Sequence, residues 1–360
     1  MLSLKWGLTY GDRKSGEFMT FASQVNTQFV GIKSIGYYLP SEVMTSHDMA
    51  QLSGIPASVF VEKIGIVQKP VAGADEHPCE MGIKAAIDAI AKADIPPSAI
   101  DLIAYCGAGD YDYRFWSPAA KIQGEIGATD AFAFEVRNFC NGGNLGLHIC
   151  RNMLLADSSY LYALVVCSDK LSHLLNYSDP ACLSTFIMAD GAAAVVLEKD
   201  EKTNRILAYH GITDGSLADF LKIPNGGTRG LNYEDHCNNL LNVENPQELD
   251  RIFSELYLKN YQLAVRTSLE KSGYGLGDVN WLLTNQVKKS LAQQIMAGLG
   301  LREDQTQFTL PEMGHLGPMD TLLGLAKSLE QGKITPGNIV VLASSAAGFS
   351  WAALTLHWLK

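Results

Sequence analysis

Cys140 lies in a segment whose neighbouring residues can make its thiol a nucleophile. The strand-like run 131–136 leads into it, Asn141-Gly142-Gly143 follows it, and an apolar helical pattern covers 145–155. We therefore expect a sharp strand-to-helix turn, with the Cys140 side chain near a helix N-terminus. Unpaired N–H groups and partial positive charge at that helix end favour a thiolate, which is suited to attack an acyl thioester. The alternative interpretation is a structural thiol at a turn.

An internal repeat in the chain predicts that His315 is equivalent to Cys140. Cys140 precedes Ser168 by the same number of residues as His315 precedes Ala343. In each half an amphipathic helix and a short turn precede an apolar strand, and a further strand follows the marked residue. The predicted elements are helix 83–93 with strands 100–106 and 160–168, and helix 261–272 with strands 279–284 and 338–345. Such a repeat predicts two similar βαβ-type units with buried, mostly parallel sheets.

His315 and Asn285 are the polar residues that we expect to serve the cysteine. His315 can withdraw the thiol proton, deprotonate an acceptor, or donate a hydrogen bond to an enolate oxygen. Asn285 does not titrate, but its amide can join His315 in a two-donor site for a thioester carbonyl. The structural alternatives are a surface histidine in a loop and an Asn that caps a helix beginning near residue 287.

Composition limits the class of protein. With 360 residues, 47% of them hydrophobic and 18% charged, the chain is predicted to be a globular α/β protein. Its net charge of −10 argues against nucleic acid or an anionic membrane as a partner. The seven cysteines have no metal-ligand spacing, which predicts a reduced, cytoplasmic protein without a metal site. No apolar run reaches the length of about 18 residues that a transmembrane helix needs.

The organisation that we expect has three parts. Residues 1–27 form an N-terminal extension, 28–200 an N-terminal half with the nucleophilic cysteine, and 201–360 a C-terminal half with Asn285 and His315. Strand-like runs cover 187–198 and 206–213. The stretch 214–247 is rich in Asn, Gly and Asp, and it predicts an irregular excursion of the kind that walls a pocket.

From about Phe29 to its C-terminus the sequence resembles the thiolase superfamily, and most closely β-ketoacyl-acyl-carrier-protein synthase III. The motifs that carry the resemblance, in the family's order, are Ile32-Lys33-Ser34-Ile35-Gly36-Tyr37-Tyr38-Leu39-Pro40, Lys63-Ile64-Gly65-Ile66, the Cys140 turn, Met188-Ala189-Asp190-Gly191-Ala192-Ala193-Ala194-Val195-Val196-Leu197 and Gly348-Phe349-Ser350-Trp351-Ala352. The resemblance implies a thiolase-like αβαβα five-layer fold from two duplicated halves, a homodimer and an acyl-cysteine intermediate. It also implies coenzyme A or phosphopantetheine thioesters as substrates, acyl-CoA or acyl carrier protein as partners, and no permanently bound cofactor.

The sequence departs from the family at two polar positions. Synthase III enzymes typically have a His-Gln pair where this chain has Asn285-Gln286, and a Gly-Asn pair where it has Gly314-His315. The His and Asn have therefore exchanged places. Asn before His is the order of the thiolases proper, but those enzymes need a second cysteine as a base, and Ser344 stands at its position. A serine hydroxyl is too weak an acid to replace that cysteine unaided, which disfavours thiolase chemistry.

The resemblance and local patterns add further candidate site residues. We expect the backbone N–H groups of Cys140 and Ala347 to form an oxyanion hole. The candidates for binding substrate or cofactor are Lys63, Trp116, His173, Lys288 and Lys289. The lysines would contact phosphates or acidic carrier residues, although solvated surface lysines are an equal alternative. Trp116 ends an aromatic loop that in the family reaches the partner's acyl pocket, and Ser117 and Pro118 would open the next helix.

Two enzymatic hypotheses follow. In the first, an enolate from a malonyl thioester attacks acyl-Cys140 in a decarboxylative Claisen condensation, as in a 3-oxoacyl synthase of specialised metabolism. In the second, His315 acts as a base and the acyl group passes to an alcohol or amine. A third hypothesis, a silent subunit that supports an active paralogue, is disfavoured because Cys140, Asn285 and His315 are all present.

Overall fold

The computed structural model describes residues 28–228 and 239–359, so the whole of the predicted N-terminal extension lies outside the described residues. The strands are β1 (Val30–Tyr38), β2 (Val43–Thr45), β3 (Gln68–Pro70), β4 (Leu102–Tyr105), β5 (Phe132–Glu135), β6 (Tyr162–Lys170), β7 (Asp190–Lys199), β8 (Arg205–Thr213), β9 (Leu221–Lys222), β10 (Asn242–Val243), β11 (Val279–Thr284), β12 (Ile339–Ala346) and β13 (Ser350–His357). The helices are α1 (Ser46–Ser53), α2 (Pro78–Ala93), α3 (Pro118–Ile126), α4 (Gly142–Ala156), α5 (Pro246–Lys271), α6 (Lys289–Leu299), α7 (Leu310–Met313) and α8 (Asp320–Glu330).

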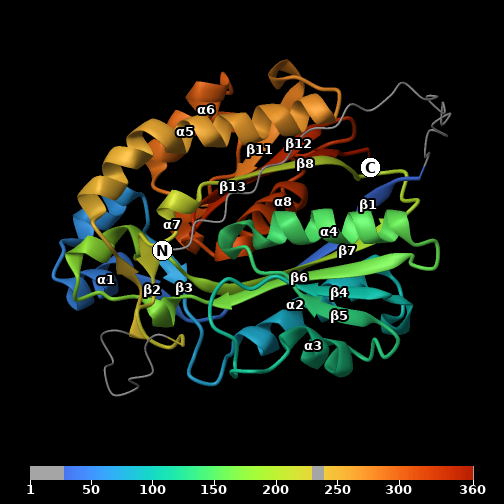
Figure 1. Cartoon of the computed structure of the whole chain (residues 1–360), viewed down its shortest axis with the longest axis horizontal. Coiled ribbons are helices and arrows are strands. Elements are labelled where there is room, and N and C mark those ends of the chain that lie inside the picture. Colours follow the sequence, from blue (N-terminus) through green and yellow to red (C-terminus); the bar gives the residue numbers. More distant parts are fainter. Residues whose placement is uncertain (1–27, 229–238, 360) are drawn as a thin grey trace, which may run out of the picture.

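The main sheet consists of two groups of strands that meet at one seam. Its strand order is β11-β12-β13-β8-β1-β7-β6-β4-β5. β1 pairs with β8 only through Gly31 and Arg205, whereas β1 and β7 pair over almost their whole length. The sheet therefore folds over at this seam, and its two parts face each other in Figure 1.

Helices and strands alternate in layers, as Figure 1 shows. Helices α5 and α6 cover the outer face of the β11-β12-β13-β8 part, and α2 and α3 cover the outer face of the other part. Helices α4 and α8 lie between the two parts. This confirms the predicted α/β thiolase-like layered fold. The prediction of mostly parallel sheets is wrong, because only the pairs β11–β12, β4–β5 and β4–β6 of the main sheet are parallel and its other neighbouring strands pair antiparallel.

The position of each strand or helix in the layers determines how deeply it is buried. Strands β6, β7, β12 and β13 are buried along nearly their whole length, because helices cover both of their faces. Helix α8 is buried on almost every side over its first turns, as expected for a helix between two sheets. The central layer therefore brings α4, which follows Cys140, close to α8, which follows His315.

Most predicted elements are present, and three differ. Helix α5 begins at Pro246, well before the predicted start at residue 261, with Asn245 as its N-cap. The segment before His315 forms the short helix α7 instead of a strand equivalent to β5. The predicted irregular stretch contains the small β9–β10 ladder, and its residues 229–238 lie outside the described part.

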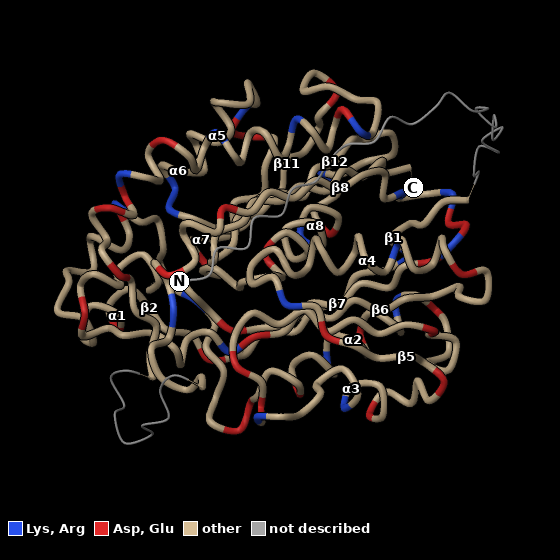
Figure 2. Tube along the Cα trace, in the orientation of Figure 1, with Lys and Arg blue, Asp and Glu red and all other residues tan. Residues whose placement is uncertain are grey.

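The predicted start of α3 is confirmed. The Ser117 side chain accepts a hydrogen bond from the backbone N–H of Ala120, and Pro118 opens the helix. In the view of Figure 2, acidic and basic residues are interspersed along the described trace. No helix in the described ranges is both long and apolar enough to cross a membrane.

Candidate active site

Cys140 lies in a single 3-10 turn, Phe139–Asn141, that runs directly into α4. The predicted strand-to-helix turn is therefore present, with β5 ending shortly before it. The glycines that follow allow neighbouring backbone to approach closely. A Cβ atom on Gly143 would lie 2.4 Å from the carbonyl oxygen of Pro318, and one on Gly142 would lie 2.8 Å from that of Cys106. Only glycine permits this approach, which brings the loop after His315 against the start of α4.

His315 is held by its backbone on the segment before β7. Its N–H donates to the carbonyl of Ile187 at 2.7 Å, and its carbonyl accepts from Ala189 N–H at 2.9 Å. Gly314 has a φ of +63°, and a Cβ atom there would lie 2.5 Å from the Ile187 carbonyl oxygen. The glycine before the histidine is thus required both by its backbone conformation and by the close approach.

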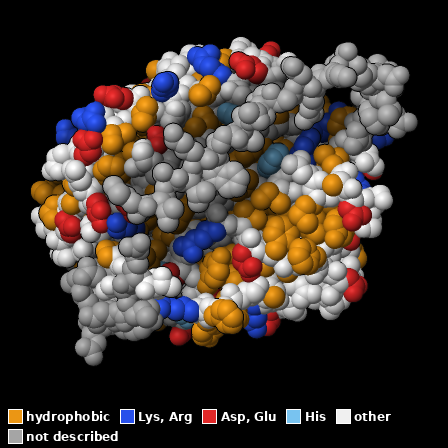
Figure 3. Space-filling model, viewed as in Figure 1, with side chains coloured by type: hydrophobic (Ala, Val, Ile, Leu, Met, Phe, Trp, Pro, Cys, Tyr) orange, Lys and Arg blue, Asp and Glu red, His pale blue; other side chains and the backbone are white. Residues whose placement is uncertain are grey.

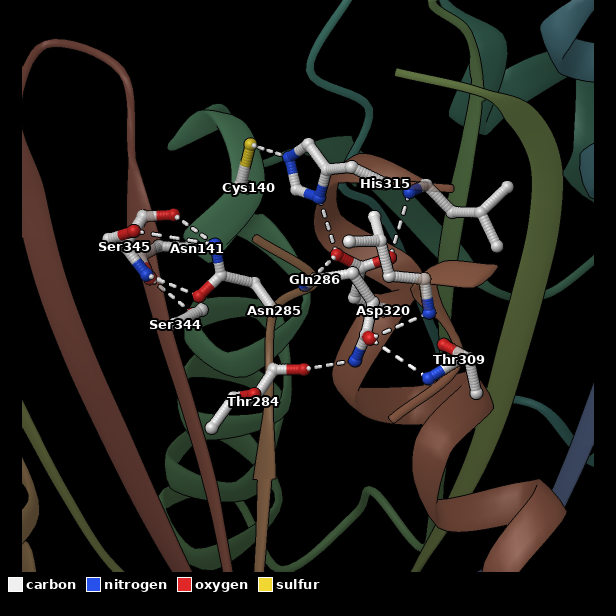
Figure 4. A network of polar contacts seen from close by, with 12 residues as sticks. Cys140, Asn141, Thr284, Asn285, Gln286, Thr309, His315, Asp320, Ser344 and Ser345 are labelled. Atoms are coloured by element: carbon white, nitrogen blue, oxygen red, sulfur yellow. Dashed lines mark hydrogen bonds and ion pairs between the residues drawn. The ribbon is translucent and has the colours of Figure 1, made fainter. Parts of the chain in front are cut away.

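The two halves bring the cysteine and the histidine into direct contact. The Cys140 sulfur lies 3.1 Å from Nε2 of His315, as Figure 4 shows. The other ring nitrogen, Nδ1, hydrogen-bonds to the Asp320 carboxylate, which can only accept, so the proton belongs on Nδ1 when the ring is neutral. Nε2 is then free to accept the thiol proton. This is the geometry of a nucleophile paired with an oriented base.

Asp320 completes the arrangement, and we did not predict it. The residue opens α8 and is 1% exposed. Its carboxylate also accepts from the backbone N–H groups of Gln286 at 2.6 Å and Leu316 at 2.8 Å, which fix its position. Burial lowers the pKa of His315, but Asp320 and Cys140 outweigh this effect and hold that pKa well above its usual value. The charged imidazolium is thus favoured beside the cysteine.

Asn285 lies beside this pair and is 4% exposed. Its Oδ1 accepts from Ser345 N–H at 3.1 Å, and its backbone N–H donates to the Ala343 carbonyl. Figure 4 shows its amide turned toward Ser345, below Cys140. The cap alternative is wrong, because the N-cap of α6 is Lys288, and the buried Asn285 ends the run of β11 instead.

Ser344 has a structural environment that its sequence position did not predict. Its hydroxyl donates to Oδ1 of Asn141, next to the nucleophile, and accepts from the Asn144 amide at 3.0 Å. Asn144 in turn accepts from the Thr321 hydroxyl at 3.0 Å. These bonds connect β12, α4 and α8 beneath Cys140. Ser344 is therefore committed to holding the turn, which agrees with its exclusion as a base.

Comparison with known proteins shows what the chain is similar to. The model for 3-oxoacyl-[acyl-carrier-protein] synthase III matches residues 134–215, and the model for its C-terminal part matches residues 269–358. The first range contains Cys140, and the second contains Asn285, His315 and Asp320. Over these ranges the chain is similar to 3-oxoacyl-[acyl-carrier-protein] synthase III, and it is therefore a synthase III-like protein. The β-ketoacyl-[acyl-carrier-protein] synthase III of Synechocystis is 28% identical over 353 residues, which cover 93% of this chain and all of that protein.

Solved structures give the same fold for this synthase III-like protein. The Aquifex aeolicus 3-oxoacyl-[acyl-carrier-protein] synthase III has a TM-score of 0.81 at 22% identity and covers 91% of this chain and 100% of its own. A priming β-ketosynthase from a polyketide biosynthetic pathway has a TM-score of 0.83 at 20% identity, over 92% of this chain and 97% of its own.

The other predicted site residues of the synthase III-like chain include Ala347 and three lysines. Ala347 lies in the turn after β12, so its place in an oxyanion hole stays a prediction. Lys63 is exposed on the short π-helix Val59–Ile64, and Lys288 and Lys289 are exposed at the start of α6. These two elements are neighbours, since a Cβ atom on Gly65 would lie 3.2 Å from that of Lys289. The three lysines therefore lie in one region of the surface.

Among the described residues, no contact connects Trp116 or His173 with Cys140. Trp116 stacks edge-on against Tyr113, with ring centroids 5.4 Å apart, and packs on the core beside β4. His173 hydrogen-bonds to the Lys170 carbonyl and lies 3.8 Å from Asp110. Burial lowers the pKa of His173, but these two partners outweigh it and raise that pKa. Within the described residues, no group of His, Cys, Asp and Glu could hold a metal ion.

A sequence signal for Asp320 exists. The helix Asp320-Thr321-Leu322-Leu323-Gly324-Leu325 is apolar except at its start, and a carboxylate that opens such a buried helix needs a partner. The histidine five residues earlier supplies one. Tyr257, which is buried close to the site, lies in the part of α5 that the sequence did not predict as helix.

Proposed function

We propose that this protein forms an acyl-cysteine at Cys140 and extends it by decarboxylative Claisen condensation with a malonyl thioester. The contact between the Cys140 sulfur and His315 Nε2 carries the proposal. Acyl-CoA or acyl carrier protein would deliver the acyl group, as the names of the relatives suggest. The three clustered lysines would contact their phosphates or acidic residues.

In the first step the thiolate of Cys140 attacks the carbonyl carbon of the acyl thioester. The bond from carbon to the carrier sulfur breaks, and the departing thiolate takes a proton from the His315 imidazolium. Backbone N–H groups at Cys140 and Ala347 would stabilise the tetrahedral oxyanion. Asp320 keeps the imidazole oriented throughout and stabilises its charged form.

In the second step the malonyl thioester loses carbon dioxide, and the electron pair of the broken bond forms an enolate. His315 gave up its Nε2 proton in the first step, and it regains one from solvent before the second. Nε2–H of the imidazolium and the Asn285 amide would then donate to the enolate oxygen. The enolate carbon attacks acyl-Cys140, a carbon–carbon bond forms, and the Cys140 thiolate leaves. The exchanged order of Asn and His still provides one imidazole and one amide for this role.

Acyl transfer to an alcohol or amine is the other candidate. The orientation of His315 by Asp320 would suit a base that deprotonates such an acceptor. The relatives found are named β-ketoacyl-[acyl-carrier-protein] synthase III, which favours condensation.

We expect acyl-CoA donors to give an adduct on Cys140, observed by intact mass, and malonyl-acyl-carrier protein to convert it to a 3-oxoacyl product with release of carbon dioxide. Product formation from an alcohol or amine without malonyl carrier would instead establish acyl transfer. An adduct with neither product would contradict both activities, and no adduct with any donor would contradict the acyl-enzyme itself.

We further propose a homodimer formed along β5. This strand is one of the two edge strands of the main sheet, and Phe132 on it is 58% exposed. Its ring stacks with that of Phe134 at 5.7 Å, and Figure 3 shows hydrophobic side chains gathered over the same region and α4. An open strand edge beside exposed aromatic rings is suited to pairing with a second copy.

Light scattering on the full chain is expected to give twice the 39.1 kDa mass of one copy. Phe132→Glu should shift the protein toward the monomer, because it places charge at the paired edge. Leu263→Glu is the matched control, since Leu263 is 46% exposed on α5, on the opposite outer layer. A monomeric wild type, or equal dissociation by both variants, would contradict a dimer at β5.

A further inference from the structure

Tyr257 places a phenol hydroxyl in the buried polar group around Asn285. The residue lies on α5, one helical turn before Tyr261, and is 4% exposed. Its hydroxyl lies 2.6 Å from the Ser345 hydroxyl. Burial raises the pKa of Tyr257 to about 12, and the neighbouring Cys140 adds to this rise, while hydrogen bonds with Ser345 and Asn285 oppose it. Tyr257 is thus neutral, and its hydroxyl belongs to the same buried polar group as Ser345 and Asn285.

The hydrogen bonds of Asn285 determine which way its amide points. Ser345 N–H can only donate, so Oδ1 of Asn285 must face it, at 3.1 Å. The amide nitrogen then lies on the other side, where its contacts with the Ser345 carbonyl and hydroxyl are long, at 3.4 and 3.3 Å. Bonds of this length are weak. The amide nitrogen therefore keeps donor capacity for a ligand.

The hydrogen bonds of the Ser345 hydroxyl determine whether the Asn285 amide nitrogen can still donate to a ligand. The bond between the Ser345 and Tyr257 hydroxyls is short, and the bond from the Asn285 amide nitrogen to the Ser345 hydroxyl is long. A buried hydroxyl that loses its strong partner must find another, because an unpaired polar group is costly in the core. The nearest available group is the Asn285 amide nitrogen. Without the Tyr257 hydroxyl, Ser345 would draw this nitrogen away from the site.

We propose that Tyr257 is a positioning residue, which acts through Ser345 to keep the Asn285 amide available for the thioester carbonyl of the extender. This inference rests on the proposed condensation and concerns its second step. Acylation of Cys140 uses His315 and Asp320, which Tyr257 does not touch in the described structure. The two steps should therefore respond differently to the loss of the hydroxyl.

Tyr257→Phe separates the steps. We expect the rate of Cys140 acylation, followed by intact mass without malonyl carrier, to stay within about twofold of wild type. Formation of the 3-oxoacyl product from the preformed acyl-enzyme should fall roughly tenfold, as for the loss of one buried hydrogen bond. The control is Tyr105→Phe, which removes a buried phenol hydroxyl that donates to the Ser168 carbonyl at 2.7 Å, away from the site. It should change neither rate.

Tyr257→Phe combined with Asn285→Ala tests whether Tyr257 affects condensation through Asn285. If Tyr257 acts through Asn285, Y257F causes no further loss of condensation there, whereas independent effects would add. An unchanged condensation rate, an equal fall of both steps, or full additivity would overturn the inference. If Y257F does not fold, the Y257F/S345A double variant removes both partners of the hydrogen bond, which costs less stability than leaving one unpaired. It also removes the hydroxyl that would draw the Asn285 nitrogen away, so its condensation rate must match that of S345A. A wild type that acylates but never condenses overturns the proposed function, and the role of Tyr257 with it.

Discussion

Cys140→Ala is expected to abolish the acyl adduct and all product formation, while the protein stays folded. Cys140 is the cysteine that the structure places at 3.1 Å from an oriented imidazole, and alanine has no nucleophilic atom. Intact mass after incubation with acyl-CoA measures the adduct directly. The substitution removes one sulfur from a partly exposed turn, so a large change in melting temperature is not expected.

Cys150→Ala is the matched control. Cys150 lies on α4, less than three turns from the nucleophile, and is fully buried. Burial raises the pKa of the Cys150 thiol far above its usual value, so it is expected to take no acyl group. The variant should form the same adduct as wild type. An adduct that survives in C140A and is lost in C150A would move the nucleophile to a position that we did not propose.

Asp320→Asn is expected to slow acylation of Cys140 by roughly 10³- to 10⁴-fold, the effect seen when the carboxylate behind a catalytic imidazole becomes an amide. The amide can present its NH₂ group to Nδ1, which forces the ring proton onto Nε2 and removes the acceptor that faces the thiol. Single-turnover acylation followed by mass measures the rate. Asp190→Asn is the control, since Asp190 is buried but accepts from the backbone of Ala72 and Ser172.

The pH dependence of the same variant gives a second readout. The Asp320 carboxylate helps to hold the pKa of His315 above its usual value, so its loss lowers that pKa. The imidazolium then disappears at a lower pH, and we expect the alkaline limb of the acylation rate to move to lower pH in D320N. A limb that stays in place would show that the carboxylate does not set the charge of His315.

The sequence alone predicted the parts of the site that depend on local patterns. The turn at Cys140 follows from a strand, two glycines and a helical period, all within about twenty residues. The equivalence with His315 follows from the repeat, and the structure brings the two side chains together. The layered fold was predicted through five separated motifs.

What the sequence did not predict depends on tertiary contacts. Asp320 is one of many carboxylates in the chain, and only the packing of α8 between the sheets places it behind His315. Tyr257 was missed because residues 246–260 carry many charged and polar side chains and show weak periodicity, although packing on the sheet makes them helical. The orientation of Asn285 depends on two donors to its Oδ1, the backbone N–H of Ser345 and the Tyr261 hydroxyl, which no local pattern reveals.

The seam between β1 and β8 has a consequence for the time at which the enzyme becomes reactive. Cys140 is synthesised 175 residues before His315. The two residues belong to different parts of the main sheet, and along the seam these parts are paired only between Gly31 of β1 and Arg205 of β8. Domains generally fold from the N-terminus during synthesis. A nascent chain that has completed only its first half carries the nucleophile without its base. The proposed capture of an acyl group, with His315 as the base, therefore requires that the second half has been made and has docked, and incomplete chains would not consume thioesters by this route.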